Sequence, residues 1–191
     1  NRFDRPHKIA ATRIAGGATA LESANNALES VATMLGVDAS AFNPVGPFPN
    51  GAHTIQLGYQ PDSGEYKFTS VYWTQTADGL PVWRTRLNVL VRNADEFPAV
   101  YATSDLRDVA GFEAPEDIRP NMTLARSAAT RFVGINSRIV GNPVVVCYAG
   151  IKDMRIAPTA AMIFEAEVGS KLQGTFEKFL LVVDLETGRA A

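Results

Sequence analysis

The feature that most constrains the fold of this sequence is an order of patterns that occurs twice. In each half, a stretch with helical spacing of apolar residues precedes several strand-like stretches. The helical stretches cover residues 20–35 and 124–133. Helices placed ahead of sequential strands favour an α+β fold, in which a helix lies across a curved antiparallel sheet, over a parallel βαβ fold. We therefore expect two units of this kind.

Both predicted helices have recognisable ends. Thr19 and Glu22 have the spacing of a capping box at the start of the first helix, and Gly36 stands at its C-cap position. Gly134 closes the second helix in the same way. These residues set the expected limits of the two helices.

The predicted strands cover residues 54–59, 66–76, 82–92 and 97–103 in the first half, and 144–148, 161–168 and 176–184 in the second. The stretch 82–92 alternates most clearly. Its expected core face is Trp83, Thr85, Leu87, Val89 and Val91, and its expected solvent face is Arg84, Arg86, Asn88 and Arg92. In 161–168, Glu165 and Glu167 alternate with apolar residues, so we expect a half-exposed sheet with both glutamates in solvent.

The breaker residues predict the limits of the units. Residues 1–16 are polar and basic and are expected to form an N-terminal arm or an extra strand. Residues 41–51 are rich in proline and glycine and predict a loop, and residues 111–120 predict a linker or turn. The expected domains are therefore 17–112 and 116–191, and a chain of 191 residues is long enough for two small cores.

Charge and hydropathy exclude two classes of partner. The net charge is -2, and three arginines on one strand face would neutralise few phosphates, so we expect no nucleic-acid binding. No stretch approaches the ~18 apolar residues of a membrane span, and no signal segment is present, so we expect no membrane insertion. The sequence begins with Asn1 rather than Met, which suggests a processed product or an excised fragment.

The chain has no recognisable catalytic or metal motif. Its one cysteine, Cys147, lies in an apolar run and predicts a buried, unreactive thiol. His7 and His53 have no ligand or triad partner at a suitable spacing and are expected on the surface. We expect no enzyme activity, no metal and no cofactor. A small enzyme that uses the concave face of its sheet stays an open alternative.

Two motifs resemble the propeptides of fungalysin-like and thermolysin-like zinc metallopeptidases. The stretch "VYWTQTADGLPVWRTRLNVLV" is similar to the core of the FTP propeptide domain, with Gln75, Gly79, Pro81 and Val82 at the matching positions. The helix "TLARSAATRFVG" and the closing "FLLVVDLETGRAA" resemble the PepSY domain that follows it. There the matching positions are Val183, Asp184, Thr187 and Gly188.

The resemblance implies two cystatin-like units, an FTP-like domain over 17–112 and a PepSY-like domain over 116–191. It implies a secreted or periplasmic zymogen, in which this region is a non-enzymatic propeptide. Such a region acts as an intramolecular chaperone and inhibitor of the metallopeptidase catalytic domain on the same precursor chain. A stand-alone secreted or periplasmic binding module with the same folds is the alternative.

The motif residues are expected to be mainly structural. Asp78-Gly79 offers a turn with positive φ, Pro81 fixes the start of a strand, and Asp184 with Gly188 frames a tight turn. The resemblance also implies that the propeptide is cleaved from the catalytic domain at a junction close to the end of this chain. Candidate partner-binding residues lie on the expected solvent face of the stretch 82–92 and in the tail near that junction. They are Arg84, Arg86, Arg92, Gly188, Arg189, Ala190 and Ala191.

Overall fold

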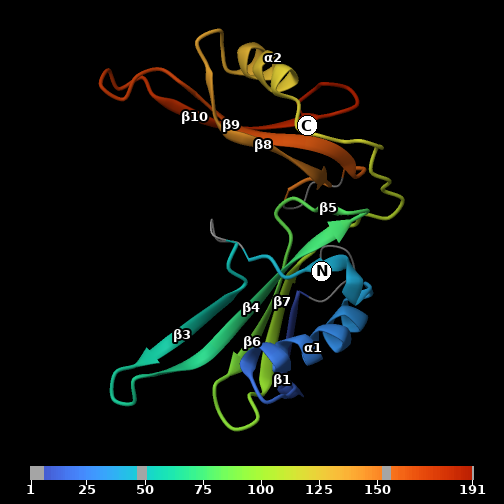
Figure 1. Cartoon of the computed structure of the whole chain (residues 1–191), viewed down its shortest axis with the longest axis vertical. Coiled ribbons are helices and arrows are strands. Elements are labelled where there is room, and N and C mark those ends of the chain that lie inside the picture. Colours follow the sequence, from blue (N-terminus) through green and yellow to red (C-terminus); the bar gives the residue numbers. More distant parts are fainter. Residues whose placement is uncertain (1–6, 47–50, 152–155, 191) are drawn as a thin grey trace. The chain divides into compact units, whose positions relative to one another are not determined.

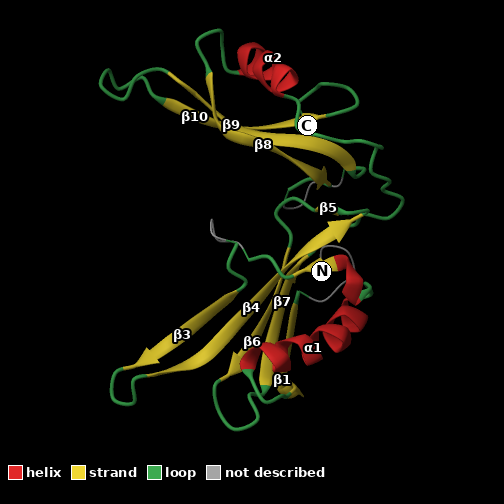
Figure 2. Ribbon diagram, in the orientation of Figure 1, coloured by secondary structure: helices red, strands yellow, loops and turns green. Residues whose placement is uncertain are grey.

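The computed structural model describes residues 7–46, 51–151 and 156–190. Contacts divide the chain into two compact units, one of Asn1–Thr76 with Arg84–Asp108 and the other of Ala77–Trp83 with Val109–Ala191. Within the described ranges, each unit combines one α-helix with an antiparallel sheet (Figures 1 and 2). The mixed architecture with mostly antiparallel strands agrees with the expected α+β class.

The first unit contains α1 (Ala20–Leu35), a short 3₁₀ helix (Ala39–Ala41) and most of the strands. The strands are β1 (Lys8–Ala15), β2 (Phe42–Asn43), β3 (Thr54–Gln60), β4 (Glu65–Ala77), β6 (Arg86–Arg92) and β7 (Ala99–Asp105). They pair in the order β1-β7-β6-β4, and both β2 and β3 pair with β4. Helix α1 packs on one face of this sheet, where Val31 and Leu35 share a core with Val71, Leu87 and Val89.

The ends of α1 are those that the sequence predicts. The hydroxyl of Thr19 accepts a hydrogen bond from the backbone N–H of Glu22, and the Glu22 carboxylate accepts one from the N–H of Ala18. At the other end, Gly36 adopts a left-handed φ of 67°. Capping interactions of this kind satisfy backbone groups that a helix leaves unpaired. The prediction of this helix is confirmed.

The N-terminal residues and the strand 82–92 differ in part from expectation. Of the two options for residues 1–16, the described part forms an edge strand, because Lys8–Ala15 pairs with β7. The predicted alternation holds within β6, where Leu87, Val89 and Val91 are buried. The strand begins only at Arg86, however, because Arg84 has a positive φ of 54° and turns the chain.

The second unit contains α2 (Met122–Phe132) and a sheet in the order β10-β9-β8. Its strands are β8 (Arg138–Tyr148), β9 (Thr159–Val168) and β10 (Glu177–Asp184). Ala125 and Ala129 of α2 pack on one face of this sheet with Met162 and Phe164. A second cluster covers the other face around Ile163.

The central strand of this sheet corrects the prediction of a solvated glutamate face. β9 is buried on both sides along most of its length. Glu167 is itself buried and pairs with Arg138 at 2.6 Å, while Glu165 pairs with Lys178 at 2.7 Å. These cations lie on β8 and β10, the strands that pair with β9. The alternation of residues along β9 alone cannot reveal which side chains lie on its neighbours.

The segment 77–83 groups with the second unit, whereas the expected boundaries place it inside 17–112. Asp78 and Gly79 form a turn with positive φ values of 42° and 78°, and β5 (Leu80–Pro81) follows. Val82 then bridges Cys147 of β8, and Ala77, Val82 and Cys147 share a buried cluster. Apolar contacts with β8 therefore decide where this segment belongs.

No helix in the described part of the chain is long and apolar enough to cross a membrane.

Candidate partner-binding surfaces

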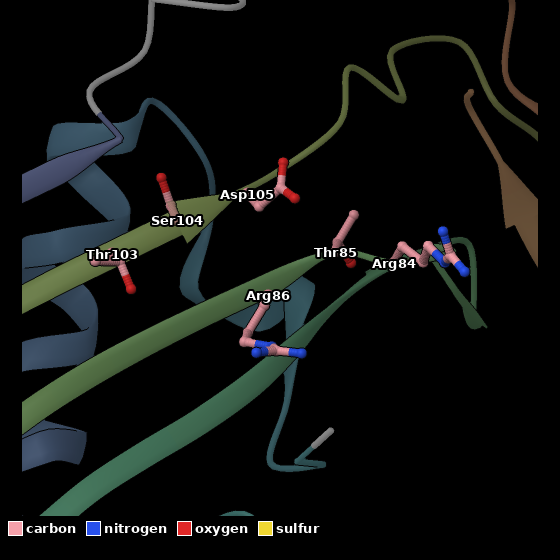
Figure 3. Close-up of a pocket in the computed structure, with 6 residues that line it drawn as sticks. All are labelled: Arg84, Thr85, Arg86, Thr103, Ser104 and Asp105. Carbon is pink, nitrogen blue, oxygen red and sulfur yellow. The ribbon is translucent and has the colours of Figure 1, made fainter. Parts of the chain in front are cut away.

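Two of the three candidate arginines line one pocket. Arg84 and Arg86 border a hollow of about 490 Å³ with Thr85, Thr103, Ser104 and Asp105 (Figure 3). Arg92 ends the same strand six residues later, which places it about 20 Å away along the strand axis. The structure therefore separates Arg92 from the other two candidates.

The pocket lies where β6 and β7 pair at their ends. Arg86 and Asp105 are opposite each other in the register of the two strands, and both line the pocket. The Arg86 guanidinium also lies over the ring of Tyr72, 5.7 Å from its centroid. Figure 3 shows Arg84 and Arg86 extending in different directions from the chain. This arrangement presents two cations beside hydroxyl groups and suits a polar or acidic surface segment of a partner.

Sequence reasoning missed the β7 residues of this pocket. Thr103, Ser104 and Asp105 belong to no motif in the sequence. The signal that unites them with Arg86 is the antiparallel register of two strands. That register comes from strand pairing, so the spacing within either strand cannot supply it.

Gln75 holds the end of the first sheet together. Its side chain is 2% exposed, its Nε2 donates to the carbonyl of Arg107 at 3.0 Å, and its Oε1 accepts from the Arg107 N–H at 2.9 Å. The Gln75 N–H in turn donates to the Thr85 hydroxyl at 3.2 Å. Arg107 is buried too, and its guanidinium donates to Asp105 at 2.7 Å. Gln75 thus fixes the segments on which the pocket residues lie.

The other residues of the first motif have backbone and packing roles. Gly79 has a positive φ that favours glycine, Pro81 lies on the short strand β5, and Val82 is fully buried against Cys147. The Asp78 carboxylate accepts a hydrogen bond from the Ala114 N–H at 2.8 Å. These contacts account for the motif residues without a direct role in binding.

Asp184 organises the turn at the end of β10. Its carboxylate accepts hydrogen bonds from the Thr159 hydroxyl at 2.5 Å and from the N–H and hydroxyl of Thr187 at 2.6 and 2.8 Å. Burial alone would raise the pKa of this carboxyl, but the hydrogen bonds from Thr159, Thr187 and Glu186 outweigh burial and lower it. The ionised form of Asp184 therefore stabilises the turn.

The tail residues fold back along β10. Gly188 adopts a positive φ of 66° and donates its N–H to the Asp184 carbonyl, and the Asp184 N–H donates to the Arg189 carbonyl, both at 2.9 Å. Ala190 forms an antiparallel bridge with Val183. Ala191 lies outside the described residues. Three of the four candidate tail residues are thus part of a hairpin.

The second unit has a pocket that the sequence does not predict. Its volume is about 560 Å³, and Phe112, Ile118, Leu124 and Leu185 provide apolar walls, with Arg119 at its border. It lies between the segment that precedes α2 and the turn organised by Asp184. These residues are distant in sequence, so only folding brings them together.

The predicted burial of Cys147 is confirmed. The side chain is fully buried, and burial raises the pKa of the thiol to about 11. No group of three or more His, Cys, Asp or Glu residues in the described ranges could hold a metal ion. The chain matches no protein-family model, and no curated protein is significantly similar to it.

Proposed function

We propose that this chain is the propeptide region of a secreted zinc metallopeptidase, made of an FTP-like and a PepSY-like unit of the cystatin type. The observation that carries the proposal is the stretch from Gln75 to Val82 followed by the Asp184–Gly188 turn, in the order of the family's two motifs. The structure is compatible with this proposal because both stretches end the strands of helix-covered antiparallel sheets.

In this role the chain binds the folded catalytic domain and does not bind its unfolded form. A partner that binds only the native state stabilises that state by mass action, and linkage in one chain raises the local concentration. The same contact restrains the peptidase until the propeptide is removed. The pocket of Arg84 and Arg86 is the contact surface that we assign to the first unit.

The tail supplies the second contact. Gly188, Arg189 and Ala190 are held beside β10, and the implied cleavage junction lies next to them. A hairpin that fixes the last described residues limits how far the junction can move from the second unit. We therefore place the start of the catalytic domain close to the β10 edge.

The test combines a reading frame with a refolding assay. We expect a His-Glu-x-x-His motif in the coding sequence beyond Ala191. The catalytic domain encoded there is denatured and refolded with and without purified 1–191, and peptide hydrolysis is measured after refolding. The mature peptidase is also titrated with 1–191. A higher refolding yield and inhibition at micromolar concentration support the proposal, and the absence of both contradicts it.

A stand-alone binding module is the second candidate, and the pocket of the second unit favours it. A hollow of about 560 Å³ that combines apolar walls with polar side chains such as Glu113, Arg119 and Glu186 has the size of small-molecule sites. If this candidate is correct, we expect a reading frame that stops near Ala191. We also expect a bound ligand to protect Phe112 and Leu124 from solvent. Ligand screening by thermal shift, with Leu124→Arg as the blocked variant, separates this candidate from the propeptide.

A further inference from the structure

The outer edge of β3 differs from the edges formed by β1, β8 and β10, the other edge strands longer than two residues in the described part of the chain. β3 pairs only with β4 there, so its far side has no strand partner. Its sequence, TIQLGYQ, contains no charged residue and no proline. Those three strands do carry such residues: β1 has Lys8 and Arg13, β8 has Arg138 and Pro143, and β10 has Glu177 and Lys178.

Charges and prolines on edge strands prevent pairing with other chains, because they disfavour a neighbouring strand at that edge. β3 therefore lacks a protection that the edges of β1, β8 and β10 have. It is also apolar on one face: Leu57 is 40% exposed and Tyr59 is 56% exposed. An exposed, uncharged strand with apolar side chains is a template for strand addition.

The direction of the backbone groups can be derived from one hydrogen bond. The Tyr72 N–H donates to the His53 carbonyl at 2.7 Å, which makes His53 and Tyr72 a hydrogen-bonded pair. Such pairs alternate along an antiparallel ladder, so Ile55 and Leu57 also bond to β4. The N–H and C=O groups of Thr54 and Gln56 therefore point away from β4.

We propose that two copies of this chain pair through their β3 strands, antiparallel about a two-fold axis at Gln56. In this register Gln56 faces the same residue of the second copy. Ile55 faces Leu57 of the second copy, and Leu57 faces its Ile55, so apolar side chains meet on one face of the joined sheet. Because β3 has no charged residue, two copies of it can pair without like-charge repulsion. A charged strand from another protein would have no opposite charge to pair with on β3.

The expected association is weak and depends on concentration. A junction of two seven-residue strands is at the low end of specific interfaces, so we expect a dimer that forms at roughly 10 to 100 µM. This pairing is independent of the proposed propeptide function, because it needs no peptidase. Sedimentation equilibrium of purified 1–191 over that concentration range measures it directly.

Two substitutions at one position test the geometry. Gln56→Pro removes an outward N–H and no bond to β4, and Gln56→Lys places two ammonium groups together at the two-fold axis. Thr12→Lys is the matched control, because it adds the same charge to an exposed position of β1, an edge that already carries Arg13. Circular dichroism establishes that each variant is folded.

We expect a monomer–dimer equilibrium for the parent chain and for Thr12→Lys, and a dissociation constant at least about ten-fold higher for both Gln56 variants. Should Gln56→Pro fail to fold, Gln56→Lys remains as the test, since it changes only an exposed side chain. Hydrogen exchange at Thr54 and Gln56 is expected to slow as concentration rises. A parent chain that stays monomeric overturns the proposal. So does dimerisation unchanged in Gln56→Lys, or binding of an added β-strand peptide at β3 without self-association.

Discussion

The side-chain amide of Gln75 makes two hydrogen bonds to the backbone of Arg107, one in each direction, at 3.0 and 2.9 Å. An amide carries a donor and an acceptor in the same geometry as a peptide group, so Gln75 replaces one residue of a β-ladder. It thereby anchors the chain that leaves β7, beside the pocket of Arg84 and Arg86. Its place in the motif is explained by this contact.

Replacement of Gln75 by Leu is expected to destabilise the protein by about 2 to 4 kcal/mol, because a buried N–H and a buried C=O lose their partners. Urea unfolding followed by circular dichroism measures the change. Gln60→Leu is the matched control, since Gln60 is exposed at the end of β3, and it is expected to change stability by less than about 0.5 kcal/mol. A loss of stability equal in the two variants would show that the amide contact is unimportant.

Replacement of Asp184 by Asn is expected to weaken the turn after β10. The hydrogen bonds that lower the pKa of Asp184 need its ionised form. A lowered folded-state pKa gives stability that is present above the ordinary value of 3.8 and is lost as pH falls through the folded pKa. We therefore expect the parent to lose stability on acidification below about pH 4, and the Asn variant to lose less of it.

Urea unfolding at pH 7 and at pH 3 gives the free energy of unfolding at each pH. The difference between the two values is compared between the parent and Asp184→Asn. Asp62→Asn is the matched control, because Asp62 lies in the exposed turn between β3 and β4. If acidification lowers the free energy of unfolding equally in the parent and in the Asp184 variant, this carboxylate does not contribute to the dependence of stability on pH.

Charge reversal in the pocket is expected to weaken partner binding while the fold is retained. Arg84→Glu and Arg86→Glu are each expected to raise the dissociation constant for the catalytic domain by roughly ten-fold or more, since they set like charge against an acidic segment. Arg92→Glu is the matched control from the far end of β6. Titration calorimetry gives the constants. Equal losses in all three variants would place the interface along the whole strand.

The thiol of Cys147 is expected to resist modification in the native protein. With a pKa of about 11, roughly one thiol in a thousand is ionised at pH 8, and burial also blocks access. We expect labelling by a thiol reagent to be slow without denaturant and complete in about 6 M guanidinium chloride. Rapid native labelling would show that β8 and Val82 separate readily.

Local patterns in the sequence are sufficient to predict the two helices and most of the strands. The capping contacts of Thr19 and Gly36 and the alternation of Leu87, Val89 and Val91 involve residues a few positions apart, so they are readable from spacing. The same holds for the positive φ at Gly79 and Gly188, where turn chemistry is local. For this reason the two helices and seven of the strands could be predicted from residue order.

The site depended on contacts between distant residues. Arg86 lies opposite Asp105 through strand register, Val82 bridges Cys147 across 65 positions, and Glu167 pairs with Arg138 on a neighbouring strand. Arg84 leaves the strand face because the chain turns there after Val82 and Trp83 bind to β8. Spacing along the chain says which face a side chain takes, but the partner across a sheet is fixed by pairing and burial, which belong to the folded chain alone.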